Sequence, residues 1–347
     1  MQKIPATIVT GFLGAGKTTL IRHLLRHAGG RRIALIVNEF GDLGVDGEIL
    51  RGCGVESCRD EDVVELSNGC ICCTVADDFV PTLLMLLNRS EPPEHIVIET
   101  SGLALPQPLV QAFAWPEVRG RVTVDGVVTV VDGPAVAAGR FAHDVAAVDA
   151  QRAADDGLDH ETPLSELFED QLACADLVVV NKADLLDDPA VLAGIEGRVR
   201  PGVSVLHAAH GALPVEVLLG RGQAAEDDLE AREAVHHHHH DDDDEDEAHE
   251  HGHDEFESFV LTRPEIGDPA AFALRVAEAM RAHDILRLKG FAAVAGKPMR
   301  LTIQAVGPRV DHHYDRPLRP GEAREARLVV IGQAGLDRAA IEAALAA

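Results

Sequence analysis

Short apolar runs alternate with longer amphipathic stretches over roughly the first two thirds of the chain. The runs are rich in β-branched residues and apolar at successive positions, which indicates strands buried on both faces of a parallel sheet. These predicted strands are Ile4–Thr10, Ile33–Asn38, Ile96–Glu99, Val127–Asp132, Leu177–Asn181 and Val203–His207. Amphipathic stretches such as Thr18–His27 and Ala76–Asn88 predict helices between them. This alternation predicts an α/β fold with a doubly wound, mainly parallel sheet.

The pattern changes after residue 256, where strands follow one another more closely. A helix is predicted at Asp268–His283, and a second one begins at Leu336. The strands predicted in this region are Glu257–Leu261, a run near Phe291–Ala295, Arg300–Val306 and Arg327–Gly332. Strands grouped in this way with few helices are typical of a small α+β domain.

Between the two patterns lies a compositional island. Residues 226–257 contain sixteen acidic residues and one basic residue, together with five consecutive histidines at His236–His240. No apolar periodicity survives there, so a solvated linker is expected. Its imidazole and carboxylate groups could also capture divalent metals weakly. We therefore divide the 347 residues into a first domain at 1–225, a linker at 226–256 and a second domain at 257–347.

The charge balance and the cysteines limit the classes of function. The chain has 31 basic and 58 acidic residues, a formal charge of −27, which disfavours nucleic acids and anionic membrane surfaces as partners. No apolar run approaches the ~18–20 residues of a membrane span, and the N-terminus has no signal-peptide pattern. The six cysteines are therefore expected in the cytoplasm, as free thiols or metal thiolates.

A phosphate-binding loop follows the first predicted strand. Residues 11–18 match G-x-x-x-x-G-K-[ST] and open a predicted helix. The glycines allow backbone N–H groups to curl around phosphates at the helix N-terminus. We expect Lys17 to reach the β- and γ-phosphates and the Thr18 hydroxyl to ligate Mg²⁺. The nucleotide-binding residues predicted here are Gly11, Gly14, Ala15, Gly16, Lys17, Thr18 and Thr19.

A base-binding motif follows a later strand. Asn181-Lys182-Ala183-Asp184 matches the N-K-x-D pattern of guanine-binding GTPases. The Asp184 carboxylate can accept two hydrogen bonds from guanine N1 and N2, and the Lys182 stem can lie over the base. Adenine lacks that pair of donors and would leave a buried carboxylate unpaired. Asn181, Lys182 and Asp184 are therefore predicted to select GTP over ATP.

Two further strand ends carry candidate switch residues. Glu99-Thr100-Ser101-Gly102 stands where GTPases have D-x-x-G, with Glu99 near Mg²⁺ or its water shell and the Gly102 N–H at the γ-phosphate. After the second strand, Glu39 and Asp42 could approach Mg²⁺, a second metal or water, or belong to a solvated loop.

The predicted catalytic residues are Lys17, Thr18 and Glu99. No residue in the sequence clearly orients the attacking water, and no arginine can be placed as a finger. We therefore expect hydrolysis by the protein alone to be slow.

Gly69-Cys70-Ile71-Cys72-Cys73 concentrates three thiols within four residues. Soft thiolates favour Zn²⁺, Co²⁺ or Cu⁺, and a helix predicted just after the motif favours the thiolate form. Three ligands in one short loop seldom complete a tetrahedron, so Glu39, a water or a partner chain is expected to supply a fourth. A buried turn and a redox switch remain alternatives for this motif. Cys53 and Cys58 could contribute ligands, whereas Cys174 is expected to serve packing.

Together these motifs resemble the CobW family of P-loop GTPases, in the metallochaperone class that includes UreG and HypB. The resemblance covers nearly the whole chain and rests on motifs at Gly11–Thr19, Asn38–Gly41, Gly69–Cys73, Glu99–Ala104 and Asn181–Asp184, with Leu288–Gly290 and Arg327–Gly332 in the C-terminal region. It implies a protein that binds its metal ion at Cys70, Cys72 and Cys73 in the Mg²⁺-GTP state. Hydrolysis of GTP would then release the ion to a client protein.

The resemblance leaves the metal open. Overall similarity, including the insert Ala142–Thr162, favours the cobalamin branch, so we expect Co²⁺ delivered to cobaltochelatase. The alternatives are Zn²⁺ supply to a metalloenzyme by the same chemistry, a regulatory GTPase whose cysteines sense redox state, and a passive metal buffer. Relatives also imply a nucleotide-dependent homodimer and a C-terminal domain that docks the client or covers the metal. His312 and His313 are expected to be solvated or to face a partner.

Overall fold

The chain folds into two compact units, Met1–His253 and Asp254–Ala347, in a computed structural model. The structure describes residues 3–38, 62–66, 79–154, 164–186, 194–227, 232, 256–306, 309–319, 321–333 and 335–346. Within these residues, no helix has the length and apolar character needed to cross a membrane.

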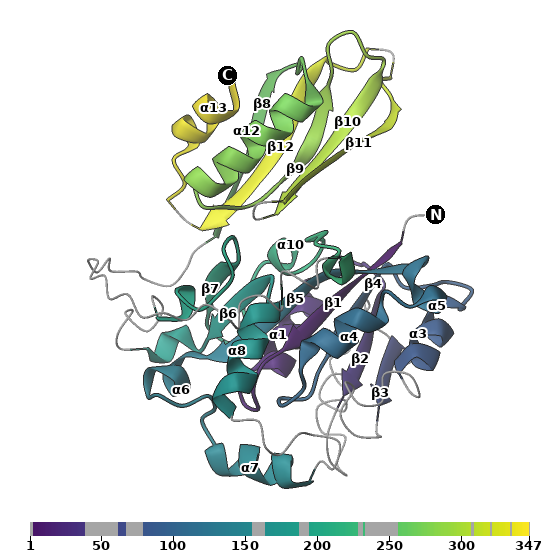
Figure 1. Cartoon of the computed structure of the whole chain (residues 1–347). Coiled ribbons are helices and arrows are strands. Elements are labelled where there is room, and N and C mark those ends of the chain that lie inside the picture. The colour runs from purple at the N-terminus through teal and green to yellow at the C-terminus, as the bar shows by residue number, and fades with distance from the viewer. Residues whose placement is uncertain are drawn as a thin grey trace. The chain divides into compact units, whose positions relative to one another are not determined.

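A parallel sheet of seven strands forms the centre of the first unit in the part of the chain that the structure describes (Figure 1). The strands are β1 (Ile4–Thr10), β2 (Ile33–Asn38), β3 (Val63–Leu66), β4 (His95–Glu99), β5 (Val122–Asp132), β6 (Leu177–Asn181) and β7 (Ser204–Ala208). Their order is β3-β2-β4-β1-β5-β6-β7, so the winding direction reverses beside β1. In such sheets, ligands bind outside the carboxyl ends of the strands at this reversal.

Helices pack against this sheet and bury its apolar strands. They are α1 (Lys17–Arg26), α3 (Val80–Leu87), α4 (Pro106–Ala112), α5 (Pro116–Arg119), α6 (Gly133–Ala137), α7 (Val145–Ala154), α8 (Leu164–Cys174) and α10 (Val215–Leu218). Leu83 of α3 and Leu109 of α4 belong to one core cluster with Ile8 and Ile98 of the sheet, all without exposed surface. Each such side chain contributes about 1.5–3 kcal/mol through burial. The core therefore holds the carboxyl ends of the strands in fixed positions.

This architecture confirms the predicted doubly wound α/β fold, with differences at several element ends. The short strand β3 was not predicted, because four residues are too few to show a period. β5 begins at Val122 rather than at the predicted Val127, and its pairing with β1 shifts register between Ala6 and Thr7. A predicted helix at Ala76–Asn88 corresponds to α3, which starts at Val80 and ends at Leu87.

The second unit is an antiparallel sheet with order β11-β10-β9-β12-β8, and α12 and α13 complete its core (Figure 1). Its elements are β8 (Phe256–Pro264), α12 (Pro269–Ala282), β9 (Ile285–Ala293), β10 (Met299–Val306), β11 (Arg309–Pro317), β12 (Glu325–Gln333) and α13 (Arg338–Ala346). Phe272 and Val276 of α12 are buried with Leu288 and Leu301 of the sheet. The predicted α+β domain is confirmed in class.

Two strands of the second unit correct the sequence-based expectations. β9 begins at Ile285 rather than near Phe291, since Arg287, Lys289 and Gly290 interrupt its apolar pattern. Gly290 is needed there because a Cβ would lie 2.0 Å from the Arg327 carbonyl oxygen on β12. β11 was not predicted, because it is a polar edge strand paired only with β10. His312 is half-buried and His313 exposed on this edge.

Packing of the first unit continues beyond residue 225, into the segment predicted as linker. The Glu226 carboxylate accepts hydrogen bonds from the Thr123 hydroxyl at 2.6 Å and from the Val124 N–H at 2.8 Å. Arg232 is 1% exposed and donates to Asp176 Oδ1 at 2.7 Å. The sequence alone predicts that both charged residues are solvated, because their partners lie far away in the chain.

Candidate functional site

The phosphate-binding loop connects β1 to α1 at the centre of the parallel sheet. Gly16 has a φ of 102°, which a side chain would strain, and a Cβ there would lie 2.2 Å from Asn181 Nδ2. The Ala15 N–H donates to the Phe12 carbonyl oxygen at 3.2 Å and closes the loop. α1 then begins at Lys17. The loop therefore places the N-terminal N–H groups of α1 where an anion can approach them.

Lys17 is folded back along the inside of this loop. Its Nζ donates to the Gly11 carbonyl oxygen at 2.8 Å and to the Phe12 carbonyl oxygen at 3.4 Å. The residue is 7% exposed. A lysine ammonium on the inside of such a loop can bind an anionic phosphate group. That Lys17 reaches the β- and γ-phosphates of a nucleotide stays a prediction.

Thr18 and Glu99 meet across the carboxyl ends of β1 and β4. The Thr18 hydroxyl donates to Glu99 Oε1 at 3.0 Å, and Glu99 is 4% exposed. Thr100 strengthens the junction, since its hydroxyl donates to the Thr10 hydroxyl at 3.0 Å. At Gly102 a Cβ would lie only 2.6 Å from the Leu13 backbone nitrogen. The segment after β4 is therefore pressed directly against the phosphate-binding loop.

These groups border a cavity of about 380 Å³. Its lining residues are Leu13, Gly14, Gly16, Lys17, Thr18, Thr19, Arg22 and Glu99. The cavity combines a lysine and an arginine with oxygen donors from a threonine and a glutamate. This chemistry suits a polyphosphate with a hard divalent cation.

Asn181 ties the base-binding motif to the phosphate-binding loop. Its Nδ2 donates to the Ala15 carbonyl oxygen at 2.9 Å, and its Oδ1 accepts the Gly211 N–H at 3.0 Å. Asn181 is 2% exposed, and both ends of its amide are used. The side chain is therefore a structural cross-link among the loop after β1, the end of β6 and the segment after β7.

The two charged residues of the motif have acidic and imidazole neighbours. Lys182 Nζ lies 2.5 Å from Asp132 Oδ2, at the carboxyl end of β5. Asp184 Oδ2 lies 3.9 Å from His210 Nε2, in the segment that follows β7. These two pairs of side chains lie at or just beyond the carboxyl ends of the adjacent strands β5, β6 and β7.

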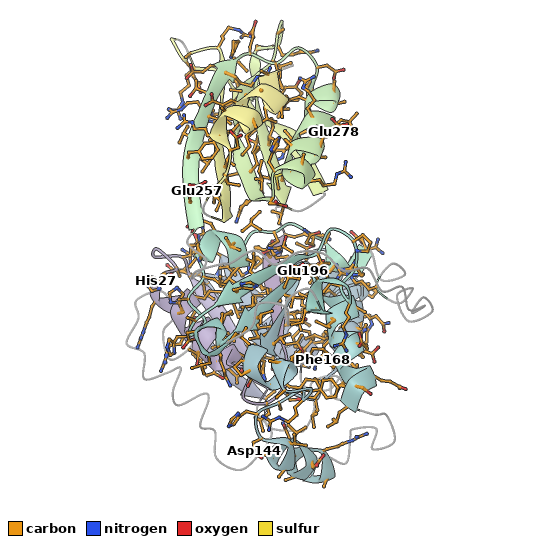
Figure 2. The ribbon with its side chains drawn as sticks, turned by 90° about the vertical axis from the view of Figure 1, so that its left-hand side faces the viewer. His27, Asp144, Phe168, Glu196, Glu257 and Glu278 are labelled. Carbon is orange, nitrogen blue, oxygen red and sulfur yellow. The ribbon has the colours of Figure 1, made fainter. Side chains whose placement is uncertain are left out.

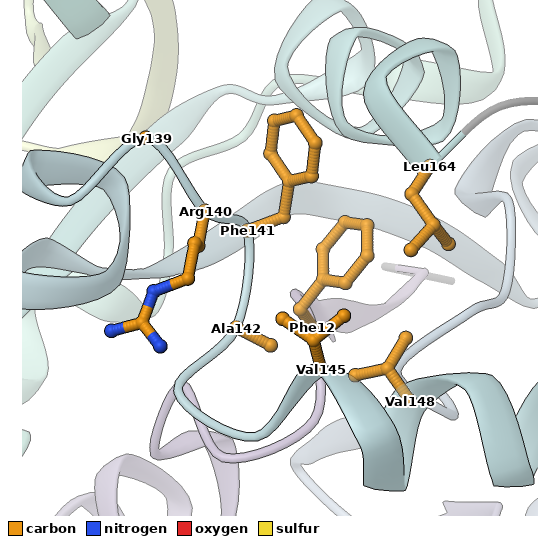
Figure 3. A pocket seen from close by; sticks show the side chains of 8 residues that line it. All are labelled: Phe12, Gly139, Arg140, Phe141, Ala142, Val145, Val148 and Leu164. Carbon is orange, nitrogen blue, oxygen red and sulfur yellow. The ribbon is translucent and has the colours of Figure 1, made fainter.

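Phe12 anchors the phosphate-binding loop on its other side. Its ring lies 6.0 Å from that of Phe141 and 6.1 Å from that of Phe168, measured between centroids. Figure 3 shows Phe12 and Phe141 beside an apolar pocket of about 230 Å³ whose walls include Val145. Phe168 itself lies among the packed side chains of the first unit (Figure 2). Aromatic contacts of this kind restrict the conformations of the loop.

Comparison with known families agrees with this arrangement. The family described as CobW/HypB/UreG, nucleotide-binding domain, matches residues 5–206. The chain belongs to the CobW/HypB/UreG family. A second match, to the family described as Cobalamin synthesis protein cobW C-terminal domain, covers residues 256–347. The protein is therefore a GTPase of the CobW type with both parts that the resemblance in the sequence implied.

Three relatives align along most of the chain. A Sinorhizobium protein named zinc chaperone CobW is 57% identical and covers 99% of this chain and 97% of its own length. A Pseudomonas aeruginosa protein of the same name is 55% identical, with coverages of 98% and 90%. The Escherichia coli protein named zinc chaperone YjiA is 29% identical, with coverages of 91% and 90%.

Sequence reasoning missed three residues near the CobW-type nucleotide site: Arg22, Asp132 and Gly211. Arg22 lines the phosphate cavity one helical turn after Thr18, and that spacing was a usable signal. Asp132 ends a predicted strand, so its position at the carboxyl edge of the sheet was also readable. Gly211 carried no such signal, because its partner Asn181 is brought near only by the pairing of β6 with β7.

The predicted metal ligands Cys70, Cys72 and Cys73 lie outside the described residues, as does Glu39. Among the residues that are described, no group of three His, Cys, Asp or Glu side chains could hold a metal ion. Cys174 is fully buried, and burial raises the pKa of its thiol to about 12. It therefore stays protonated at neutral pH, in agreement with the packing role expected for it.

Proposed function

We propose that this protein is a GTP-dependent zinc metallochaperone. The observation that carries the proposal is the identity of 55–57% to two proteins named zinc chaperone CobW, extended over at least 98% of this chain. At this similarity we expect the phosphate-binding loop, the base-binding motif and the cysteine motif at Gly69–Cys73 to act together as in those relatives. Zinc therefore replaces cobalt as the metal that we propose, and delivery to cobaltochelatase becomes the less supported reading.

The nucleotide part of the proposal assigns the phosphates of GTP to the cavity at the phosphate-binding loop and the guanine base to the motif after β6. Lys17 would bind the β- and γ-phosphates, and Asp184 would accept the N–H groups of the guanine edge. Gly102 lies against Leu13 of the loop, and its N–H is the donor that we propose for the terminal phosphate. The remaining residues proposed to bind the nucleotide are Gly11, Gly14, Ala15, Gly16, Thr18, Thr19, Glu39, Asn181 and Lys182.

Mg²⁺ fits the donor set at the same place. The Thr18 hydroxyl and the Glu99 carboxylate are hard oxygen donors 3.0 Å apart, and Mg²⁺ prefers such ligands. When bound, Mg²⁺ would neutralise charge on the transferred phosphoryl group. The chain's own contribution is to hold the two oxygens together and to keep Lys17 beside the loop. Thr18, Glu99 and Lys17 are accordingly the residues that we propose for catalysis.

The zinc ion is the cargo in this proposal, and Cys70, Cys72 and Cys73 are its proposed ligands. Thiolates bind Zn²⁺ well, and soft thiolate ligands are among those that select Zn²⁺. A thiol cluster without special geometry therefore retains zinc in competition with cobalt. The relatives' names and the preference of thiolate ligands point to the same metal.

Nucleotide state would control the release of zinc to a client protein. A ligand shifts a conformational equilibrium only by its differential affinity for the two states. A 10⁴-fold change in zinc affinity needs about 5.5 kcal/mol between the GTP and GDP states. The gain or loss of thiolate ligands could supply that difference. A nucleotide-dependent homodimer is part of the same proposal, since a second chain could complete the zinc shell.

Competitive titration tests the proposal. Zn²⁺ is titrated against a chelating dye with Mg²⁺ and either a non-hydrolysable GTP analogue or GDP, and Co²⁺ is then titrated in the same way. We expect one tight Zn²⁺ site that weakens at least a hundredfold in GDP. Cys72→Ala should abolish that site. Cys174→Ala is the matched control, because this thiol is buried and protonated and its removal should leave zinc affinity unchanged.

Other outcomes separate the alternative functions. If the protein in the GTP state keeps Co²⁺ bound in the presence of an equal concentration of Zn²⁺, the result would favour the cobalt chaperone hypothesis. Zinc binding that disappears when residues 236–253 are deleted, and survives Cys72→Ala, would indicate a passive buffer. GTP hydrolysis that responds to oxidant and ignores zinc would indicate a redox-sensing GTPase.

A further inference from the structure

Asp132 belongs to none of the nucleotide-binding motifs, yet it stands beside one of them. It is the last residue of β5 and pairs in register with Asn181, the first residue of the base-binding motif on β6. Its side chain is 1% exposed. Asp132 therefore presents a buried carboxylate at the carboxyl edge of the sheet, next to the place where a guanine base is proposed to bind.

Both carboxylate oxygens of Asp132 are engaged. Oδ1 accepts the Ala135 N–H at 3.1 Å and caps the first turn of α6, while Oδ2 lies 2.5 Å from Lys182 Nζ. The turn after Asp132 is also closely packed, since a Cβ on Gly133 would lie 3.1 Å from the Asn181 carbonyl oxygen. The carboxylate cannot rotate away from Lys182 without losing the cap.

Lys182 is constrained at both ends as a result. Its backbone has a φ of 60°, an unusual value for a residue with a side chain, and its ammonium is held by Asp132. Its side chain keeps 30% of its surface exposed. A free lysine has several rotatable bonds, and ordering them on binding costs up to about 2 kcal/mol. With both ends held, the exposed methylene stem is ordered before the nucleotide arrives.

We infer that Asp132 is a positioning residue for GTP, which fixes the Lys182 stem as one face of the guanine site. The inference rests on the proposed GTP site and adds a residue to it. Asp132 acts through Lys182 on the face of the base, whereas Asp184 acts on its hydrogen-bonding edge. These two roles predict different responses to a change of base.

Asp132→Asn separates the ion pair with Lys182 from the hydrogen bond that caps α6. Asparagine is nearly isosteric and caps helices as well as aspartate does, so the Ala135 contact persists while the charge pair is lost. The dissociation constants of GTP, GDP and ITP are measured for wild type and variant. We expect all three to rise by about tenfold, equivalent to about 1.4 kcal/mol. The ratio of GTP to ITP affinity should stay the same, because ITP differs from GTP only at the edge of the base.

Asp144→Asn is the matched control. Asp144 Oδ1 accepts the Ala147 N–H at 3.0 Å and caps α7 in the same way, and the residue is exposed. Figure 2 shows Asp144 at the edge of the first unit. This variant removes the same charge and keeps an analogous cap, so its nucleotide affinities should equal those of wild type.

A double-mutant cycle tests whether Asp132 acts through Lys182. In a Lys182→Met background, Asp132→Asn should change GTP affinity less than twofold, because the group that it positions is gone. Lys182→Arg, which can still pair with Asp132, should retain more affinity than Lys182→Met. This comparison keeps the inference testable even if Asp132→Asn does not fold.

The outcomes distinguish this inference from the proposed function. If wild type binds GTP and Asp132→Asn binds it equally well, the positioning role is wrong and the GTP site stands. Equal losses from Asp132→Asn with and without Lys182 would also reject the role. A wild-type protein that binds GTP and ATP equally would overturn the base site itself, and the inference with it.

Discussion

Asn181 Nδ2 donates to the Ala15 carbonyl oxygen at 2.9 Å, although the two residues are 166 positions apart. The other end of the amide accepts the Gly211 N–H at 3.0 Å. One side chain therefore joins the phosphate-binding loop, the base-binding motif and the segment after β7. Because the loop is bonded to the motif, the two halves of the nucleotide site cannot move apart independently.

Asn181→Ala should lower both stability and GTP affinity. It leaves the Ala15 carbonyl and the Gly211 N–H buried without this partner, at about 1–3 kcal/mol for each group. Denaturant unfolding and nucleotide titration measure the two effects. Asn88→Ala is the control, since Asn88 Oδ1 accepts only an exposed arginine hydrogen bond at 3.0 Å. Equal unfolding free energies for the two variants would contradict the cross-link.

Thr18→Ala and Glu99→Gln should each reduce GTP turnover by about 10²–10³-fold at saturating nucleotide, comparable to the loss of one catalytic donor. The Thr18 hydroxyl and Glu99 Oε1 lie 3.0 Å apart and are proposed to hold Mg²⁺ together. The Mg²⁺ concentration for half-maximal activity should rise in both variants. GDP affinity measured without Mg²⁺ should change little; a large loss there would mean that these residues act on folding or on the phosphates directly.

Arg232→Ala should destabilise the first unit by about 3–5 kcal/mol, because it leaves a buried carboxylate without its closest cation. Arg232 is 1% exposed and lies 2.7 Å from Asp176, which Arg200 also approaches at 3.4 Å. Thermal unfolding measures the effect. Arg338→Ala is the control, because its ion pair with Glu342 is exposed and should contribute at most about 1 kcal/mol. Equal melting temperatures for Arg232→Ala and wild type would refute this role.

His95 should make stability fall in acid. Its pKa is lowered from 6.5 to about 4 in the folded chain; burial is the main cause, Asp125 opposes the shift, and Arg31 contributes to it. Below pH 6.5 His95 gains a proton in the unfolded chain, whereas in the folded chain it gains that proton only near pH 4. The free energy of unfolding should therefore decline across this window, by about 3 kcal/mol from His95.

Comparison with His95→Gln isolates that contribution. The wild-type curve should be steeper than that of the variant between pH 6.5 and 4, and the two should run parallel below pH 4. Thr7, whose hydroxyl lies 2.8 Å from His95 Nε2, keeps a polar partner in the glutamine variant. His143→Gln, an exposed change, should follow wild type. Parallel curves throughout for wild type and His95→Gln would show that His95 has the same pKa in the folded and unfolded chains.

Much of the fold was predictable because strands buried in a parallel sheet appear in the sequence as runs of consecutive apolar residues. β1 and β6 were predicted with their observed bounds, since most of their residues are apolar and buried. β11 and the start of β9 were missed for the opposite reason. Their polar residues lie on an edge or on an exposed face, where pairing with β10 and β12 decides the strand.

The sequence by itself determined the family, the fold class and the motif residues, because short-range spacing is enough to identify the motifs. It left open which metal the proposed chaperone carries. Only the tertiary structure decided that Asn181 cross-links the site, that Asp132 holds Lys182 and that Arg232 is buried. These contacts join residues far apart in the chain, and their energy depends on burial that no local pattern records.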